Sequence, residues 1–336
     1  MMKALSFFTS LLHYLPAELS HSLGMLSLKV LYKIGLTNFL FKKSIPKNKI
    51  SPTRIKGKIF TEQVPNKLGF AAGLDKNGDY IDCLAALGIG FIEIGTVTPR
   101  PQRGNSRPRL FRDLKNKALI NRMGFNNKGV EYLVNKVKTR RSNIPIGISI
   151  GKNFDTPLDL ANTDYLFCLE KVYPYADYVA VNISSPNTEG LRSLSSEERL
   201  ESLLSQLKHK QKALSELHSY KPIYIKLSPD ESQEDLTAIC KMIRESQIDG
   251  VICSNTSVDH HFNEGGGVSG EPLKQKSTDT IKLVRQKVGG DLPIIASGGV
   301  MNVEDYKEKI FAGADLVQIY TGFIYKGPVL IDEILH

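Results

Sequence analysis

Polar residues that could bind a planar ligand follow short β-rich runs along the chain. Lys226 lies inside the apolar run 223–228 (IYIKLS), where desolvation of a cation is costly unless an anionic or electron-rich partner is close. A reduced flavin ring would supply such a partner, and an ion pair with a core carboxylate is the alternative. Amide side chains follow other runs and would converge on one site: Asn121, Asn182, Asn187 and Asn255. Because an amide both donates and accepts hydrogen bonds, this set suits a heterocycle with alternating carbonyl and N–H edges, such as a pyrimidine.

Glycine-rich turns follow the last two β-rich runs. Ser297-Gly298-Gly299 ends one of them, and Tyr320-Thr321-Gly322 ends the other. Glycine lets backbone N–H groups approach phosphate oxygens without a Cβ in the way, and paired loops of this kind often bind a phosphate. The pattern favours a ligand that carries a phosphate over a pair of tight turns without a ligand.

The elements that must position these residues repeat eight times. The β-rich runs cover 69–74, 91–95, 146–151, 178–183, 223–228, 250–255, 294–298 and 315–320. Helical patterns lie between them, at 127–141, 195–217, 231–247, 274–289 and 302–313. Alternation of this kind predicts an α/β protein whose parallel strands close into a (β/α)8 TIM barrel. A doubly wound open sheet is the alternative, but polar and glycine residues crowd nearly every strand end here, as they do where a barrel builds its active site.

Composition limits the classes of protein that remain. The chain has 336 residues, enough for one barrel with an appendage, and 41% of them are apolar. Its four cysteines are spaced singly, without a C-x-x-C pair, which argues against zinc, iron–sulfur and disulfide frameworks, so no metal is expected. The absence of a G-x-G-x-x-G strand-turn-helix unit argues against a nicotinamide site.

The N-terminal segment has the pattern of two short amphipathic helices. Apolar residues recur at helical spacing from Phe7 to Leu15, Pro16 suits the start of a second helix, and the spacing continues to Ile34 before Gly35. The segment could lie in a membrane interface or pack on the main domain as a helical hairpin. A signal peptide is a weaker third interpretation, because no small-x-small cleavage site appears.

The excess positive charge lies in the first part of the chain. The whole sequence has 44 Lys+Arg and 35 Asp+Glu, a net charge of +9, and residues 1–58 hold ten of the basic residues and one acid. The remainder is therefore neutral, which argues against a nucleic-acid surface, although the basic run 100–112 is unexplained. A cationic segment with an apolar face suits an anionic membrane leaflet.

Five motifs give the chain a family resemblance. They are 69–76 (GFAAGLDK), 95–101 (GTVTPRP), 121–127 (NRMGFNN), 182–192 (NISSPNTEGLR) and 318–328 (QIYTGFIYKGP). With them the sequence resembles the class 2, quinone-dependent dihydroorotate dehydrogenases over essentially its whole length. The resemblance implies FMN at the barrel mouth and oxidation of dihydroorotate to orotate in pyrimidine biosynthesis. It also implies ubiquinone or menaquinone as the electron acceptor.

The resemblance implies roles for individual residues. Ser185 would be the catalytic base that takes the C5 proton while the C6 hydride passes to flavin N5, with Thr188 as its partner through a water and Phe125 closing over the site. Class 1 relatives have a cysteine in place of this serine. The positions matching FMN contacts are Ala72, Gly73, Lys76, Thr96, Ser149, Asn182, Lys226, Ser254, Gly270, Gly299, Tyr320 and Thr321. Those matching orotate contacts are Lys76, Asn121, Arg122, Met123, Gly124, Phe125, Asn182, Asn187, Asn255 and Thr256.

Three positions depart from the family pattern. Ser149 stands where the family usually has an asparagine that contacts the flavin, Ser254 replaces a threonine and Thr321 replaces a serine. The latter two keep a hydroxyl, whereas Ser149 loses the amide donor pair.

The resemblance also implies a division of the chain. Residues 1–43 would form a helical extension that holds an apolar quinone tunnel, with His21, Arg112 and Tyr320 meeting the quinone head group. Residues 44–68 would be a linker with short strands at the barrel base, and 69–336 the FMN barrel. The protein would be peripheral on the cytoplasmic side of a bacterial inner membrane, without nucleic acid or an obligatory protein subunit as partner. The alternatives are a flavin-dependent barrel reductase acting on uracil in RNA and a non-catalytic membrane-surface binding module.

Overall fold

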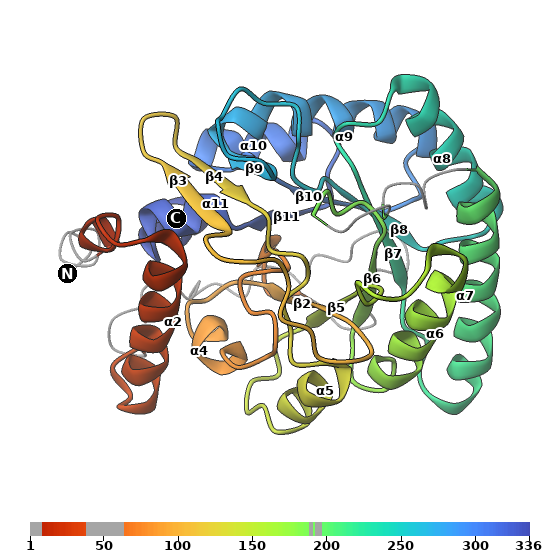
Figure 1. The fold of residues 1–336 in the computed structure, drawn as a ribbon, viewed down its shortest axis with the longest axis horizontal. Coiled ribbons are helices and arrows are strands. Elements are labelled where there is room, and N and C mark those ends of the chain that lie inside the picture. The colour runs from red at the N-terminus through yellow and green to blue at the C-terminus, as the bar shows by residue number, and fades with distance from the viewer. Residues whose placement is uncertain (1–8, 38–63, 188–190, 192–196) are drawn as a thin grey trace.

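Eight parallel strands close into a barrel in the computed structural model, which describes residues 9–37, 64–187, 191 and 197–336 (Figure 1). Around the barrel the order is β1-β11-β10-β8-β7-β6-β5-β2. The strands are β1 (Leu68–Phe70), β2 (Phe91–Val97), β5 (Ile146–Ile150), β6 (Tyr178–Asn182), β7 (Ile223–Leu227), β8 (Gly250–Cys253), β10 (Ile294–Ser297) and β11 (Leu316–Ile319). Each coincides with one of the eight predicted runs, which confirms the (β/α)8 barrel.

The barrel strands are buried along their whole length because side chains fill the space on both faces. Tyr178 and Tyr224 pack edge to face inside the barrel, with ring centroids 5.3 Å apart. Glycine on the neighbouring strand makes room for each ring. A Cβ on Gly147 would lie 2.0 Å from Tyr178 Cζ, and a Cβ on Gly250 would lie 2.2 Å from Tyr224 Cε1. These two glycines therefore allow bulky aromatic residues in a narrow barrel.

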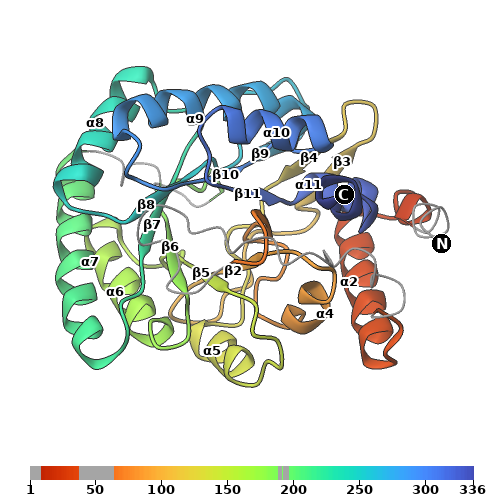
Figure 2. The same ribbon diagram turned by 180° about the vertical axis from the view of Figure 1, so that it is seen from behind.

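Helices form the outer layer between the strands (Figure 2). They are α4 (Ile81–Ala85), α5 (Val130–Lys138), α6 (Ala161–Val172), α7 (Glu197–Leu217), α8 (Gln233–Glu245), α9 (Lys274–Val288), α10 (Val303–Phe311), α11 (Thr321–Lys326) and α12 (Val329–Leu335). Two 3-10 turns, η1 (Leu158–Leu160) and η3 (Glu271–Leu273), precede α6 and α9. Ser232 and Asn302 accept backbone N–H bonds at the starts of α8 and α10, so local capping fixes where these helices begin.

A small antiparallel sheet, absent from the sequence prediction, lies outside the barrel. It joins β3 (Leu110–Asp113), β4 (Ala118–Asn121) and β9 (Gly267–Gly270) in the order β3-β4-β9. Asp113 begins the turn between the first two strands by accepting the N–H of Asn116 at 2.9 Å. In this sheet the segment 118–121 pairs with the segment 267–270, although nearly half of the sequence lies between them. No local sequence pattern predicts this pairing.

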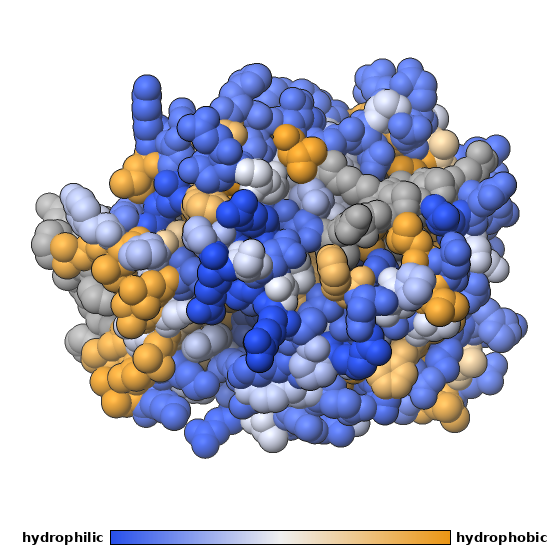
Figure 3. Space-filling model, in the orientation of Figure 1, coloured by the Kyte–Doolittle hydropathy of each residue, from blue (hydrophilic) through white to orange (hydrophobic). Residues whose placement is uncertain are grey.

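The described part of the N-terminal segment is helical and lies against the barrel. Residues 9–12 are helical, and α2 (Ala17–Lys33) follows Pro16, as predicted. One narrow face of α2 is buried, with Ala17, Ser20, Met25 and Leu28, and packs against α4 and β3. Larger apolar side chains on α2 and just beyond it are 38 to 67% exposed: Leu19, Leu23, Leu26, Val30 and Ile34. They form the apolar patch over α2 at the left of Figure 3.

Among the described residues no helix is both long and apolar enough to cross a bilayer. The predicted linker, 44–68, and the start of the extension lie largely outside the described residues, so the division at 43 and 68 stays a prediction.

Candidate active site

A cavity opens where the carboxyl ends of the barrel strands meet, and most of the predicted site residues line it. From the predicted cofactor set it is lined by Ala72, Gly73, Lys76, Thr96, Asn182, Lys226, Ser254, Gly299, Tyr320 and Thr321. From the predicted substrate and catalytic sets it is lined by Asn121, Met123, Gly124, Phe125, Ser185, Asn187, Asn255 and Thr256. Residues more than 200 positions apart in sequence therefore meet in one place, as the barrel topology requires.

The predicted amide side chains do converge, and hydrogen bonds join them into two groups. Asn255 Nδ2 donates to Asn182 Oδ1 at 3.1 Å, and Asn182 Nδ2 donates to Thr96 Oγ1 at 3.2 Å. On the other side, Asn187 Nδ2 donates to Asn121 Oδ1 at 3.0 Å, and Asn121 Nδ2 donates to the carbonyl of Gly267 at 3.1 Å. These bonds orient the amides so that their remaining donors and acceptors can meet a ligand.

Ser185 lies between these two groups and is almost fully buried. Its hydroxyl oxygen accepts the N–H of Asn187 at 3.3 Å, which leaves the hydroxyl proton free to be passed to another acceptor. Thr188, the predicted partner, is outside the described residues.

Lys226 carries a buried ammonium group that faces the cavity. The residue is 6% exposed, and its ammonium group has no hydrogen-bond or ion-pair partner among the described residues. Burial lowers its pKa, and the charge of Glu93 acts in the opposite direction. One carboxylate oxygen of Glu93 accepts hydrogen bonds at 2.8 Å from Tyr178 and from Gln318, and no hydrogen bond joins its other oxygen to Lys226. The alternative prediction, an ion pair between Lys226 and a core carboxylate, is therefore not what the described residues show.

Lys76 also lines the cavity, but the environment of its ammonium group differs from that of Lys226. Its ammonium group donates to the carbonyl of Gly73 at 2.9 Å. Desolvation, with a further contribution from the nearby Arg109 charge, lowers the pKa of Lys76 to about 8, while Glu18 and Asp75 act in the opposite direction. The same lysine is therefore poised to lose its charge in mildly alkaline solution.

The glycine turns after β10 and β11 bring backbone close to neighbouring elements. A Cβ on Gly299, where φ is +75°, would lie 2.3 Å from Lys274 Cα, at the start of α9. Thr321 Oγ1 lies 2.8 Å from Ser269 Oγ of β9, so the small sheet adds a hydroxyl to this end of the cavity. The geometry suits a ligand group that is bound through backbone N–H and hydroxyl groups.

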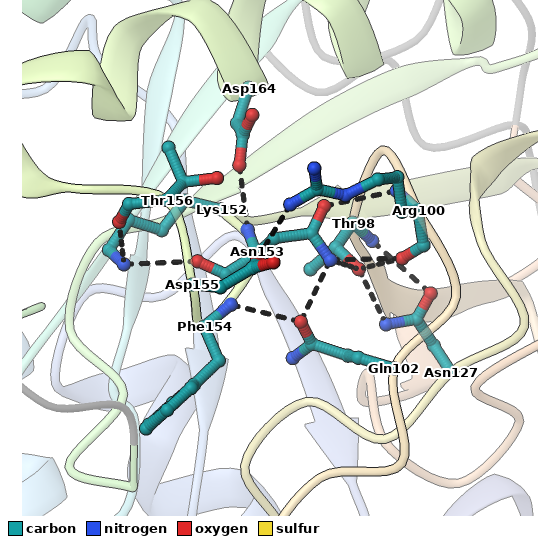
Figure 4. Close-up of polar contacts among 10 residues, drawn as sticks. All are labelled: Thr98, Arg100, Gln102, Asn127, Lys152, Asn153, Phe154, Asp155, Thr156 and Asp164. Carbon is teal, nitrogen blue, oxygen red and sulfur yellow. Dashed lines mark hydrogen bonds and ion pairs between the residues drawn. The ribbon is translucent and has the colours of Figure 1, made fainter.

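A network of amides positions the turn at Gly124 and Phe125. Figure 4 shows the bonds that join its members Gln102, Asn127 and Asn153 to one another or to Thr98. Gln102 Nε2 donates to the carbonyl of Gly124 at 3.0 Å, and Asn127 Nδ2 donates to that of Phe125 at 2.7 Å. Asn153 completes the network by donating to Gln102 Oε1 at 2.8 Å. Gly124 and Phe125 both have positive φ, +66° and +51°, a conformation that a phenylalanine keeps only when its surroundings enforce it.

A second, mostly apolar cavity lies between α2 and α11. His21 lines it together with Met25, Leu28, Phe323 and Ile324. Desolvation lowers the pKa of His21 to about 4, so its imidazole is neutral at physiological pH. Helix α11 contributes to both cavities, since Thr321 and Gly322 line the first one and Phe323 and Ile324 line the second.

Some predicted site residues do not line the cavity to which they were assigned. Ser149 is fully buried behind Thr96, with the two hydroxyl oxygens 2.8 Å apart, and Gly270 lies behind Thr321. The Arg122 guanidinium donates to the carbonyl of Pro108 at 2.9 and 3.1 Å. Among the tunnel residues, Tyr320 lines the first cavity instead of the second.

Arg112 does not line the second cavity itself, but it contacts residues that do. Its guanidinium donates to the carbonyl of His13 at 2.9 Å and to Ser20 Oγ at 3.0 Å. Arg112 thus holds the turn that leads into α2, and through Ser20 it contacts the wall of the apolar cavity.

Sequence reasoning missed several residues of the site. Leu110 and Leu119 from the small sheet, Ser269 next to Thr321, and Gln318 in the barrel floor all line the cavity. The segment 110–121 does contain a signal, since two β-rich runs flank the turn-forming LKNK, which is typical of a hairpin.

Comparisons with known proteins agree with this geometry. A family profile described as dihydroorotate dehydrogenase matches residues 54–336. The chain belongs to the dihydroorotate dehydrogenase family.

Relatives of known name place the chain within that family. It is 48% identical over 334 residues to "Dihydroorotate dehydrogenase (quinone)" of Hamiltonella defensa, with 97% of each chain covered. It is 47% identical over 329 residues to the protein of the same name from Vibrio parahaemolyticus, with 96% of each covered. A DHODH crystal structure from Eimeria tenella, in complex with ferulenol, matches with a TM-score of 0.81 and 30% identity, covering 95% of this chain and 89% of that one. The predicted membership of the quinone-dependent class is thereby confirmed, and this dihydroorotate dehydrogenase family is flavin-dependent.

Proposed function

We propose that this protein oxidises dihydroorotate to orotate, with FMN as its cofactor and a membrane quinone as its electron acceptor, in pyrimidine biosynthesis. The observation that carries the proposal is a single cavity that holds Ser185, four converging amides, the buried Lys226 and the partly buried Lys76. This combination matches an anionic pyrimidine lying against a second aromatic ligand.

The residues of the cavity fit FMN. The Lys226 ammonium group is buried and without a partner among the described residues, so a bound group with partial negative charge would stabilise its charged form. The glycine turn at Gly299 and the paired hydroxyls of Thr321 and Ser269 suit a phosphate. When bound, FMN supplies a two-electron acceptor that no side chain of the protein can provide.

We assign the remaining cofactor contacts to residues that line the cavity. Ala72, Gly73, Lys76, Thr96, Asn182, Ser254 and Tyr320 would hold FMN together with Lys226, Gly299 and Thr321. Ser149 and Gly270 would act through Thr96 and Thr321, which they contact.

The amides would bind the pyrimidine ring and Lys76 its carboxylate. Asn121, Asn187 and Asn255 each have part of their amide engaged with protein, and this fixes the direction of the donors and acceptors that remain. A charged Lys76 adds the electrostatic complement for an anionic substrate. Met123, Gly124, Phe125 and Thr256 would complete the walls of the substrate site.

Ser185 would act as the base that removes the C5 proton of dihydroorotate. A serine hydroxyl is a weak base at its ordinary pKa, so it must pass its own proton onward while it accepts the new one. The N–H of Asn187 fixes the hydroxyl oxygen, and Thr188 is the proposed acceptor of the outgoing proton through a water.

The second cavity is the proposed route for the quinone. It is apolar, it opens between α2 and α11, and the neutral His21 imidazole offers one donor and one acceptor for a quinone carbonyl. The exposed leucines of α2 and the basic residues Lys29 and Lys33 support attachment of the extension to an anionic bilayer surface, at the cytoplasmic side of a bacterial inner membrane.

A steady-state assay with different acceptors tests the proposal. Orotate formation should proceed with ubiquinone or menaquinone analogues and stop when NAD⁺ is the only acceptor. Orotate formation with NAD⁺ at a rate equal to that with quinone would refute the assignment of the acceptor.

Ser185→Ala tests the role of the base. Reduction of the bound flavin by dihydroorotate should slow by roughly 100-fold or more, since general base catalysis contributes factors of this size. Reoxidation of chemically reduced enzyme by quinone should be unchanged, because Ser185 lies in the first cavity and not in the second. Equal loss in both half-reactions would argue against a base role.

A further inference from the structure

The N-terminal extension contributes to the substrate side of the molecule as well as to the quinone side. We propose that Glu18 of α2 is a positioning residue for the dihydroorotate site, because its ion pair with Arg109 holds the 103–109 loop against Asn187 and Gly124. The inference rests on the proposed function and extends it to a residue that lies outside the barrel and outside the substrate cavity.

The ion pair between Glu18 and Arg109 is mostly shielded from solvent. Arg109 Nη2 and Nε lie 2.8 and 3.2 Å from Glu18 Oε1, and the side chains are 7% and 23% exposed. The neighbouring Arg107 reaches the same oxygen at 3.2 Å, but its side chain is 74% exposed. Shielding makes the first pair the stronger one, since exposed pairs contribute little and buried arginines need a partner.

Arg109 uses its other donors to close the loop that precedes it. Its Nη1 donates to the carbonyl of Arg103 at 2.6 Å and to that of Asn105 at 3.2 Å. The carbonyl of Arg109 itself accepts the N–H of Arg122 at 2.9 Å. The guanidinium therefore fixes both ends of the 103–109 loop, and Glu18 fixes the guanidinium.

Asn105, in the middle of this loop, contacts the segments that form the substrate site. Its Nδ2 donates to the carbonyl of Asn187 at 3.3 Å, and its N–H donates to the carbonyl of Met123 at 3.1 Å. Gly124 packs so closely on it that a Cβ there would lie 2.7 Å from Asn105 Oδ1. An unbroken series of contacts thus joins α2 to residues that line the cavity.

Removal of the Glu18 charge leaves Arg109 as a nearly buried cation without its carboxylate. The guanidinium must then donate hydrogen bonds to water, and these compete with its bonds to the loop carbonyls. Asn105 would lose its fixed position, and the Asn187 and Gly124 walls would be less well ordered before the ligand binds. Binding would have to restore that order, so affinity for the pyrimidine falls while the chemistry at Ser185 is retained.

Glu18→Gln in the FMN-loaded full-length protein tests the proposal. The measurement is the dissociation constant of orotate, taken from the change that it causes in the flavin absorbance, without any electron acceptor. We expect orotate to bind about tenfold more weakly, as suits the loss of one charge-assisted hydrogen bond. KM for dihydroorotate should rise by a similar factor, and the limiting rate of flavin reduction should change by less than about threefold.

Arg107→Ala is the matched control. It removes a guanidinium from the same carboxylate oxygen but no contact with the loop carbonyls, so orotate affinity should stay within about twofold of that of the native protein. Asn105→Ala is the second variant, because it breaks the contact with Asn187 and leaves α2 and the ion pair intact. Asn105→Ala should weaken orotate binding by a factor similar to that for Glu18→Gln.

Three outcomes separate the possible failures. Native orotate affinity in FMN-loaded Glu18→Gln, or in Asn105→Ala, would overturn the inference and leave the proposed function intact. A lower FMN content and melting temperature, with native orotate affinity in the loaded fraction, would show a role in stability alone and would also overturn it. If orotate causes no change in the flavin spectrum of the native protein, the proposed function itself fails.

Discussion

At the scale of single residues, Lys76 predicts a pH dependence for orotate binding. Desolvation first, and the charge of Arg109 second, lower its pKa to about 8, so the ligand-free protein loses this positive charge as pH rises through that value. Orotate is an anion at these pH values, so its affinity should be constant below about pH 7 and fall by up to tenfold per pH unit above about pH 8. Titration of the flavin absorbance with orotate, at pH values on both sides of 8, measures this.

Lys76→Arg supplies the control for that prediction. Arginine remains charged throughout the range, so the pH dependence should flatten even if the altered shape weakens binding overall. If orotate affinity depended on pH with the same slope in the variant, a group other than Lys76 would be responsible for the pH dependence.

Gln102 should control affinity for the substrate through the backbone of Gly124. Its amide nitrogen donates to the Gly124 carbonyl at 3.0 Å, and its oxygen accepts from Asn153 Nδ2 and from the N–H of Phe154 (Figure 4). Gln102→Glu keeps the size and the acceptor but replaces the donor by an anion that faces a carbonyl. Orotate should then bind at least about tenfold more weakly, because a buried acceptor is left unpaired and repelled.

Gln206→Glu is a matched control for the Gln102 substitution. Gln206 makes a single exposed bond to Ser202 on α7, so the same change there should leave orotate affinity and melting temperature nearly native. Loss of affinity in both variants would point to a general effect of added negative charge.

The residues that the sequence could predict are those with a recognisable chemistry at a strand end. Lys226, Ser185 and the four asparagines belong to this group, and they line the cavity. Gln102, Asn105 and Glu18 could not be predicted, because their partners are backbone carbonyls or side chains that only the folded chain brings near them.

At the scale of elements, the barrel was predictable because a buried parallel strand is apolar along its whole length. Most of the strands end one to four residues earlier than the β-rich runs, since the polar residues at their carboxyl ends turn into the site instead of continuing the ladder. The β3-β4 hairpin has a local signal in its turn, but its strands have only four residues each, and β3 is partly exposed, so the apolar pattern that marks the barrel strands is weak there. The third strand of the sheet, β9, pairs across a long stretch of sequence.

Helix α2 should bind membranes through the side chains that it leaves exposed. Leu23 and Leu26 are on its outer surface, so Leu23→Glu with Leu26→Glu should abolish binding to vesicles that contain anionic lipid. The buried face of α2 is unchanged, and orotate binding should therefore stay native. Co-sedimentation with vesicles and the orotate titration measure the two effects separately.

Leu217→Glu serves as the control for α2. Leu217 is a highly exposed leucine at the end of α7, on the other side of the molecule (Figure 1). Its replacement should leave vesicle binding unchanged. Retention of vesicle binding by the α2 double variant would contradict the assignment of this helix to the membrane surface.

At the scale of the whole molecule, α11 contributes to the walls of two cavities. The first has mixed polar and apolar walls and contains Ser185 and both lysines; the second is mostly apolar and is lined by α2 of the extension. The excess charge of the chain belongs to residues 1–58, and the rest is neutral. This division suits a reaction in two halves, in which a water-soluble anion enters through one opening and a membrane-soluble acceptor through the other.

The most direct test of this account is an anaerobic absorbance spectrum of the purified full-length protein during two successive additions. The protein should show the absorbance of bound FMN, dihydroorotate should bleach it with the appearance of one equivalent of orotate, and a quinone added afterwards should restore it. A protein that takes up no FMN, or whose flavin stays oxidised with excess dihydroorotate, would contradict the central claim.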